Sequence, residues 1–297
     1  MDTTIVPSAP VGNEVRRCLI SLLDQAIALL ADEAQPSSTR IHEARKLCKR
    51  ARGLLRLARP ALGWIYQREN KAIRNAARLI SEDRDRKVLV ETCDALIKTG
   101  IDTGDQDSAL SVLQFLQEDY ESEVEDEDTV NAHMEDCRDK LRECRKRIEK
   151  LSFDKASEKA LCDGIAHIYK QARQGLEIAS HEPNSTNFHD WRKDVKYHRY
   201  HLEFLIQLWE PVLSSLRQEA KDLASKLGEE HDLAVLQSSL RSMRKDLDPK
   251  GVAALDQAAA QRREILKSES LEQGSKLLAA KPKAIKKQFA ALFEAAD

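Results

Sequence analysis

The chain has 297 residues, enough for two average domains or for one unit that occurs twice. Its 48 Lys and Arg nearly balance 50 Asp and Glu, so any electrostatic function has to come from local clusters of charge. With 41% hydrophobic and 5% aromatic residues, and only ten Gly and eight Pro, the composition excludes collagen-like, membrane-spanning and wholly disordered classes and favours helices.

The apolar residues recur with a period close to 3.6, which predicts amphipathic helices separated by short polar breaks. In the first half we expect helices over residues 12–31, 38–59, 64–80, 83–99, 106–124 and 130–151. In the second half we expect them over residues 159–180, 186–208, 212–227, 230–246, 252–271 and 279–295. No segment shows a sustained strand-like alternation, so the expected fold class is all-α, built as antiparallel helical bundles.

The cysteines and the first predicted helix indicate a reducing, cytoplasmic location. None of the six Cys forms a CxxC pair, and each lies in a helical pattern, so we expect reduced, buried thiols. Residues 18–30 superficially resemble a signal sequence, but Asp24 interrupts them and their apolar residues keep the helical period. The acidic residues 118–128 are expected to form a solvated helix end or a connector.

The chain aligns with itself at a shift of 147 residues. The segment IHEARKLCKRARGLL (41–55) lies over FHDWRKDVKYHRYHL (188–202), and LISEDRDRKVL (79–89) lies over KLGEEHDLAVL (226–236). This ungapped register pairs His42 with His189, Arg45 with Arg192, Lys46 with Lys193, Lys49 with Lys196, Arg52 with Arg199 and Asp85 with Asp232. We therefore expect two duplicated units, over residues 12–150 and 159–297, that together form one domain.

The predicted helix over residues 40–59 has two unlike faces. It carries eight Lys or Arg and one acid, Glu43, and the cations fall on one side while Ala and Leu fill the other. Surface helices usually mix the two signs, because like charges one turn apart repel each other whereas Glu–Lys pairs are stabilising. The segregation therefore indicates an anionic ligand that contacts this helix and its counterpart.

The length of the stripe favours a polymeric anion. At 1.5 Å per residue the cations span roughly 21 Å, so two such stripes form a track for many phosphate groups. Nucleic acid and inorganic polyphosphate both fit this description. Proteins that bind single-stranded nucleic acid interleave aromatic rings for stacking, and the first stripe has no ring apart from His42. In the second stripe Trp191, Tyr197 and Tyr200 offer rings, of which the pattern around Trp191 is more typical of a core.

The pattern H-x-x-R-K-x-x-K-x-x-R, which occurs at 42–52 and again at 189–199, resembles that of the CHAD family, the conserved histidine α-helical domain. Residues 79–85 and 227–232 resemble the second helical motif of that family. The resemblance implies two pseudo-symmetric helical bundles whose basic motif helices face a central channel that binds inorganic polyphosphate. It also implies association with polyphosphate granules.

Carried over position by position, the resemblance implies a set of polyphosphate-binding residues. They are His42, Arg45, Lys46, Lys49, Arg52, Arg56, His189, Arg192, Lys193, Lys196 and Arg199. Arg56 aligns with Glu203, so the second stripe is shorter than the first. Arg74, Lys221 and Arg84 are candidates for lining the channel, although Arg84 aligns with His231. Asp85 and Asp232 are expected either to hold the guanidinium groups in place or to serve as helix-first-turn acids.

The sequence contains no convincing catalytic constellation. The patterns E-x-x-H, H-E-x-x-H, E-x-E-x-K and the phosphate-binding glycine loop are missing, so we expect neither a resident metal nor a cofactor. The first hypothesis is a binding module for inorganic polyphosphate without catalysis. The alternative is a helical nucleic-acid or protein adaptor, and the sequence leaves the oligomeric state open.

Overall fold

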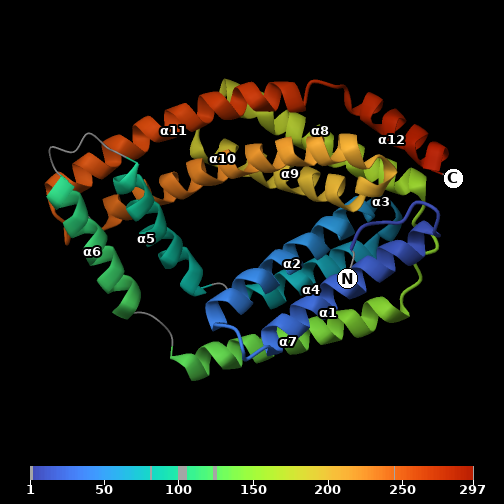
Figure 1. Ribbon diagram of the computed structural model, residues 1–297, viewed down its shortest axis with the longest axis horizontal. Coiled ribbons are helices and arrows are strands. Elements are labelled where there is room, and N and C mark those ends of the chain that lie inside the picture. The colour runs from blue at the N-terminus through green and yellow to red at the C-terminus, as the bar shows by residue number, and fades with distance from the viewer. Residues whose placement is uncertain (1–2, 81, 100–105, 123–125, 244, 297) are drawn as a thin grey trace.

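The computed structural model describes all residues except 1–2, 81, 100–105, 123–125, 244 and 297, and of residues 82–85 it describes the backbone alone. Every regular element in the described part is helical (Figure 1), which confirms the all-α prediction. The elements are α1 (Val11–Ala31), α2 (Ser37–Leu57), α3 (Arg59–Leu62), α4 (Trp64–Arg78), α5 (Glu82–Lys98), α6 (Gln106–Ser122), α7 (Glu127–Lys150), α8 (Glu158–His181), α9 (Ser185–Phe204), the 3₁₀ turn η1 (Ile206–Leu208), α10 (Glu210–Ser242), α11 (Pro249–Leu277) and α12 (Pro282–Ala296).

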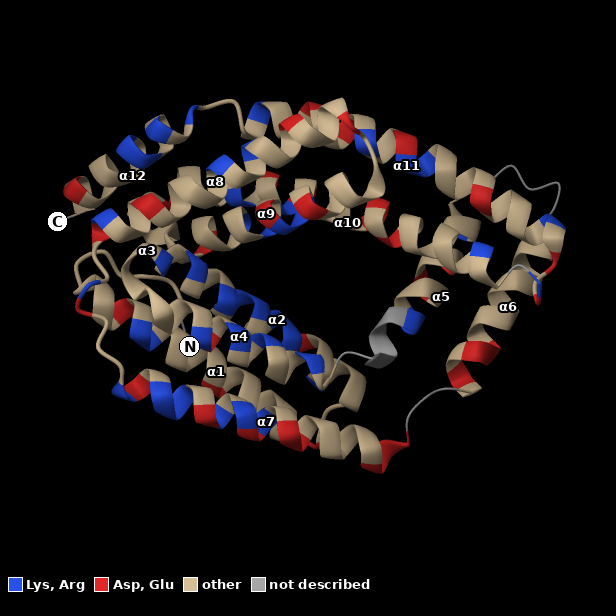
Figure 2. Cartoon of the chain, turned by 180° about the vertical axis from the view of Figure 1, so that it is seen from behind, with Lys and Arg blue, Asp and Glu red and all other residues tan. Residues whose placement is uncertain are grey.

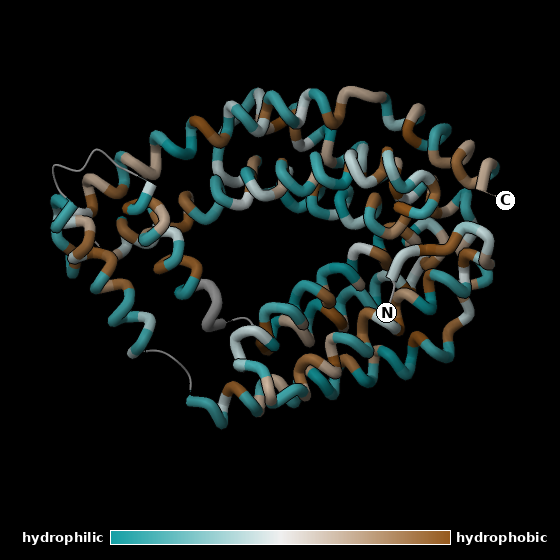
Figure 3. The backbone as a smooth tube through the Cα atoms, viewed as in Figure 1, coloured by the Kyte–Doolittle hydropathy of each residue, from teal (hydrophilic) through white to brown (hydrophobic). Residues whose placement is uncertain are grey.

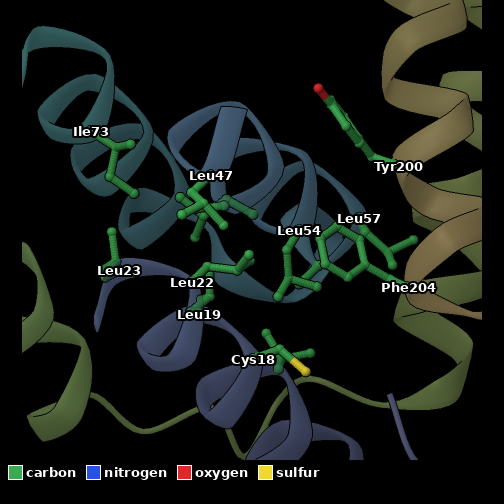
Figure 4. Close-up of a cluster of buried hydrophobic side chains, with 14 of the residues drawn as sticks. Cys18, Leu19, Leu22, Leu23, Leu47, Leu54, Leu57, Ile73, Tyr200 and Phe204 are labelled. Carbon is green, nitrogen blue, oxygen red and sulfur yellow. The ribbon is translucent and has the colours of Figure 1, made fainter. Parts of the chain in front are cut away.

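Helices α1, α2, α4 and α7 form the first bundle. Leu19, Leu22 and Leu23 recur at helical spacing along α1 and are fully buried, because this stripe packs against the apolar face of α2. Figure 4 shows these side chains together with Leu54 and Leu57 of α2. In the same view Phe204 of α9 points toward the two α2 leucines, so this core continues into the second half of the chain.

Helices α8, α9 and α10 pack around a second core, which α11 and α12 cover. Trp191 and Phe188 of α9 lie at its centre, fully buried, with their rings in an edge-to-face contact at 5.9 Å. Trp191 therefore belongs to the core, as the pattern around it indicated.

A third core joins parts of the two halves. Helices α5 and α6 pack against the far ends of α10 and α11, burying Leu89, Leu113, Leu236 and Leu255 in one cluster. Figure 3 shows the hydrophobic turns of these helices gathered at one end of the molecule. The cores thus do not coincide with residues 12–150 and 159–297, and the boundaries of the two units stay a prediction.

Two predicted helices are one helix in the structure. The prediction of separate helices over residues 212–227 and 230–246 is wrong, because α10 continues through Gly228 without a break. A β-carbon at Gly228 would lie 3.3 Å from Nη2 of Arg192. The glycine thus leaves room for a neighbouring side chain, and it does not end the helix.

The predicted helix over residues 186–208 ends earlier than expected, at Phe204, and is followed by η1.

All six cysteines are buried and free, as expected: Cys18, Cys48, Cys93, Cys137, Cys144 and Cys162. Burial raises the pKa of Cys48 and Cys93 to about 12 and of Cys144 and Cys162 to about 11, so these thiols stay uncharged at neutral pH. Within the described residues, no helix is both long enough and apolar enough to span a bilayer.

Candidate anion-binding site

Helix α2 separates its apolar and cationic residues as predicted. Ala44, Leu47, Ala51 and Leu54 are at most 8% exposed and pack into the first core. Figure 2 shows Lys and Arg positions, in blue, along much of the α2 ribbon. This segregation concentrates positive charge on one side of a single helix.

Helix α9 crosses α2 at a point where the two backbones come close. A β-carbon at Gly53 would lie 3.1 Å from the side chain of Tyr200, so a glycine suits the crossing. Nε2 of His201 lies 3.2 Å from the carbonyl oxygen of Gly53 and ties the two helices together. Asn184 caps the start of α9 by accepting a hydrogen bond from the backbone N–H of Asn187, at 2.9 Å.

The contacts at this crossing are reciprocal under the 147-residue shift. Arg50 pairs with Glu203 at 2.8 Å, and the guanidinium of Arg56 lies 4.1 Å from the ring centre of Tyr197. Glu203 is the counterpart of Arg56 and Tyr197 that of Arg50, while Gly53 meets its own counterpart, Tyr200. Reciprocity of this kind is typical of elements related by a two-fold axis. The division into two repeated units stays a prediction.

A cavity of about 590 Å³ opens between α2, α5, α9 and α10. Its basic lining comprises His42, Lys46, Lys49, Arg192, Lys196, Arg199, Lys221 and, from α11, Arg262. The acidic side chains that line it are Glu91 of α5 and Glu229 and Asp232 of α10. The cations come mainly from α2 and α9, so the cavity has one strongly basic side and one mixed side.

Two further cavities adjoin the first along α2. One of about 540 Å³ shares Lys49, Lys196 and Tyr200 with it and extends along the other side of the crossing, where Arg52, Arg56, Asp190, Lys193, Asp194 and Tyr197 line it. A smaller one of about 120 Å³ lies between α2 and α4 and is lined by Arg45, Cys48, Lys49, Arg52, Arg74, Ala77 and Arg78. Lys49 lines all three, so the cavities are neighbours, and we refer to them together as the basic region.

Several guanidinium groups of this region are held in place by the protein. Nη1 of Arg45 donates to the carbonyl oxygen of Ile80 at 3.2 Å, and Nε of Arg52 donates to Oδ1 of Asn70 at 3.0 Å. Arg262 donates from Nε and Nη2 to the two carboxylate oxygens of Glu229, at 2.7 and 3.2 Å. Such contacts fix the donors before a ligand arrives, which reduces the entropy that binding would otherwise cost.

One carboxyl group in the 540 Å³ cavity is only weakly acidic. The pKa of Asp194 is raised to about 6, mainly by burial and also by the neighbouring Asp190, while Arg56 and Lys193 oppose the shift. Near pH 6 about half of these carboxyls are therefore protonated, so Asp194 opposes an anionic ligand less than an ordinary aspartate would.

The aromatic rings near the basic region offer few open faces. Trp191 is fully buried, and Tyr200 is 4% exposed with the guanidinium of Arg199 at 4.6 Å from its centre. Arg56 covers one face of Tyr197. These three rings therefore make a poor platform for stacking bases.

The family model of the CHAD domain matches residues 14–241, which include both basic helices. The chain belongs to the CHAD family. No curated protein matches the chain significantly. Among solved structures, the crystal structure of the CHAD domain from the plant Ricinus communis is similar to it, with a TM-score of 0.57 at 16% sequence identity over 94% of each chain. At this level of identity the likeness shows a common fold.

Within this CHAD fold, the structure brings most of the predicted site residues to the basic region. All of the predicted binding residues except His189 line at least one of the three cavities, and so do Arg74, Lys221 and Asp232. The side chains of Arg84 and Asp85 lie outside the described part of the chain. The supporting role of Asp232 stays a prediction.

His189 lies against α10, and it is not among the residues that line the three cavities. Its ring centre is 4.1 Å from that of His231. The pKa of His189 is lowered to about 4, mainly by burial and also by the nearby His231, Lys193 and Arg192, while Asp190 opposes the shift. The imidazole is therefore neutral at physiological pH, whereas its counterpart His42 lines the large cavity.

Arg78 and Arg262 line the basic region and were missed by the sequence analysis. Arg78 follows Arg74 by one helical turn, and this spacing was a signal that could have found it. Arg262 has Phe115 as its counterpart at the 147-residue shift, so the repeat gave no indication of it. Among the described residues, no group of three or more His, Cys, Asp or Glu is arranged to hold a metal ion.

Proposed function

We propose that the chain binds inorganic polyphosphate along the basic region between α2 and α9. The observation that carries the proposal is the convergence of Lys and Arg from two crossing helices on adjoining cavities of about 590 and 540 Å³. Separate cations of one sign repel each other in the free protein, so a polyanion that contacts both helices relieves this repulsion.

The shape and lining of the region favour a polymer that carries charge but no bases. A single phosphate group needs two or three donors, whereas the cations of α2 and α9 extend over several helical turns. Nucleic acid would require faces for stacking, and Trp191, Tyr197 and Tyr200 are buried or partly covered. The nucleic-acid or protein adaptor is therefore the second candidate.

In this proposal the protein acts without catalysing a reaction. The channel would attach the protein to polyphosphate granules in the cytoplasm, or organise such granules, through contacts with phosphate oxygens. Binding by contacts to charged oxygens releases counterions, so the affinity should fall linearly with salt on a double-logarithmic plot.

The test compares long-chain polyphosphate binding by the wild type and by the variant Lys46→Gln, Lys196→Gln, Lys221→Gln. These lysines line the large cavity and are exposed or half-buried. We expect the triple variant to bind at least about tenfold more weakly, with a shallower salt dependence, because each lost lysine removes a charge-assisted contact. Isothermal titration at several salt concentrations measures both quantities.

A matched control removes the same charge elsewhere. Lys146, Lys150 and Lys155 are exposed and line none of the three cavities, so their replacement by Gln should leave the affinity nearly unchanged. Competition completes the test: if single-stranded RNA displaces the polymer at equal phosphate concentration, or if both variants bind like the wild type, polyphosphate is not the ligand of this region.

A further inference from the structure

A group of basic side chains lies where α8 packs against α2, α3 and α9 (Figure 1). Arg59, His167 and Lys170 are exposed and line none of the three cavities, whereas Arg56 is half-buried and lines the 540 Å³ cavity. We refer to these four residues together as the α8 basic patch. Three of them are not explained by the basic region between α2 and α9.

The backbone of α8 touches the end of α2. A β-carbon at Gly164 would overlap the carbonyl oxygen of Leu57. His167 follows Gly164 by three residues, and side chains three residues apart lie on one side of a helix. His167 therefore lies toward the end of α2, where Arg56 precedes Leu57 and Arg59 begins α3.

The register of α8 against α9 brings Lys170 to the same place. The two helices run antiparallel, because later residues of α8 contact earlier residues of α9. The contacts are those of Tyr169 with His198, at 5.3 Å between ring centres, and of Gly175 with Trp191, whose indole would lie 3.0 Å from a β-carbon on the glycine. In this register Lys170 lies at the level of Tyr197, which lines the 540 Å³ cavity together with Arg56. The patch thus borders that cavity.

The cations of the patch are close enough to act on one imidazole. The pKa of His167 is lowered, mainly because part of the ring is shielded from water and also by Arg59, Lys170 and Arg56. These three cations come from α3, α8 and α2, so the positive charge converges from separate helices. A polyanion that contacts all of them relieves their mutual repulsion.

Aromatic rings hold both guanidinium groups of the patch. Arg56 lies over Tyr197 at 4.1 Å, and Arg59 lies over Tyr66 at 5.0 Å. Such stacking uses the face of a guanidinium, whereas its N–H groups point outward in the plane and can donate to phosphate oxygens. The patch therefore presents oriented donors to an anion.

We propose that the α8 basic patch binds the part of a long polyphosphate chain that extends beyond the cavities between α2 and α9. Arg56 belongs to the 540 Å³ cavity and to the patch, so it marks the place where the chain passes from one to the other. This inference rests on the proposed function and adds a preference for long chains, since a short chain contacts the cavities alone.

The test compares long-chain polyphosphate with tripolyphosphate by isothermal titration. The variant Arg59→Gln, Lys170→Gln should bind the long chain about tenfold more weakly than the wild type does, because charge-assisted contacts are lost. Its affinity for tripolyphosphate should stay close to that of the wild type. For the long chain, the slope of the double-logarithmic salt plot should become shallower by about one for each lost contact.

A matched control removes the same two residue types from another surface. Arg142 and Lys146 lie on the exposed side of α7 and line none of the three cavities. The variant Arg142→Gln, Lys146→Gln should bind both chains like the wild type. The single variant Lys170→Gln removes no stacked guanidinium, and it should show a smaller loss for the long chain alone.

Chemical labelling locates the bound chain without a substitution. Long-chain polyphosphate should slow the acetylation of Lys170 by an N-hydroxysuccinimide ester, as measured by mass spectrometry, and tripolyphosphate should not. Lys155 is exposed and lines no cavity, so it serves as the internal reference.

Three results would overturn the inference. They are wild-type affinity of the Arg59, Lys170 variant for the long chain, an equal loss of its affinity for both chains, and an equal loss in the control variant. None of them bears on the basic region itself, which the Lys46, Lys196, Lys221 variant tests. Thermal melting of each variant shows whether the fold stays intact.

Discussion

Two histidines of the second basic helix lie in the core of the protein and not on its charged face. His198 is 4% exposed and lies edge-on to Tyr169 at 5.3 Å, and His201 is fully buried at the crossing with α2. Burial lowers the pKa of His198 to about 4 and of His201 to about 3. His198 and His201 are therefore neutral core side chains at neutral pH. Helix α9 carries less positive charge than its number of histidines suggests.

This burial predicts that stability depends on pH through His198. Its pKa is near 6.5 in the unfolded chain and about 4 in the folded one. Above about pH 6.5 the imidazole of His198 is neutral in both the folded and the unfolded state. As the pH falls, the unfolded state takes up the proton first, so stability is lost between about pH 6.5 and 4. At about pH 5 the expected loss is on the order of 2 kcal/mol.

Urea unfolding at about pH 7.5 and pH 5 measures the effect, with His198→Phe as the comparison. The lowered pKa values of His201 and His189 act in the same direction and the raised pKa of Asp194 in the opposite one, but these groups are common to both proteins, so the difference reports on His198. A loss of stability that is the same in wild type and variant would show that His198 does not titrate as inferred.

At the scale of helices, glycines decide which elements approach closely. A β-carbon at Gly164 of α8 would overlap the carbonyl oxygen of Leu57 at the end of α2, so the crossing of these helices requires a glycine. Gly228 of α10 faces the flexible end of Arg192. The first contact involves backbone that cannot move alone, whereas the second involves a side chain that can.

We therefore expect opposite effects from two similar substitutions. Gly164→Ala should lower the free energy of unfolding by about 1–3 kcal/mol, the usual cost of overpacking. Gly228→Ala should leave it unchanged or raise it by up to about 1 kcal/mol, because alanine favours the helix. Urea titration of both variants provides the measurement, and equal destabilisation would contradict the distinction between backbone and side-chain contacts.

The helices themselves were largely predictable from sequence, because each has an apolar stripe with the helical period. The main exception was the break predicted at Gly228, since a glycine ends some helices and permits a close contact within others. The cations of α2 were predictable for the same reason, as one face of one helix. The grouping of these cations into cavities could not be predicted from the sequence. Arg45 faces α4, whereas His42 and Lys46 face α5 and α10.

At the scale of the whole molecule, two of the three cores connect the halves of the chain. The first core takes in Leu161 and Ile165 of α8, and the third joins α5 and α6 to α10 and α11. The sequence repeat gave no sign of these contacts, because a repeat shows which segments are alike and not which of them pack together.

This arrangement predicts that neither half folds fully alone. In a fragment of residues 1–152, α5 and α6 lack their partners, and the apolar side chains of Leu89 and Leu113 become exposed. Hydrogen exchange should find the amides of α5 and α6 far less protected in the fragment than in the full chain. Adding residues 157–297 should restore the protection, and full protection in the isolated fragment would argue against the prediction.

The reciprocal crossing of α2 and α9 has a consequence for the polarity of a bound chain. A strand of nucleic acid has a direction because its two ends differ chemically, whereas a linear polyphosphate has two identical ends. Arg50 with Glu203 and Arg56 with Tyr197 are equivalent contacts under the 147-residue shift, so the binding region proposed above would suit a ligand without direction. The protein itself differs on the two sides, at Arg56, whose counterpart is the acid Glu203, and at Arg262, whose counterpart is Phe115.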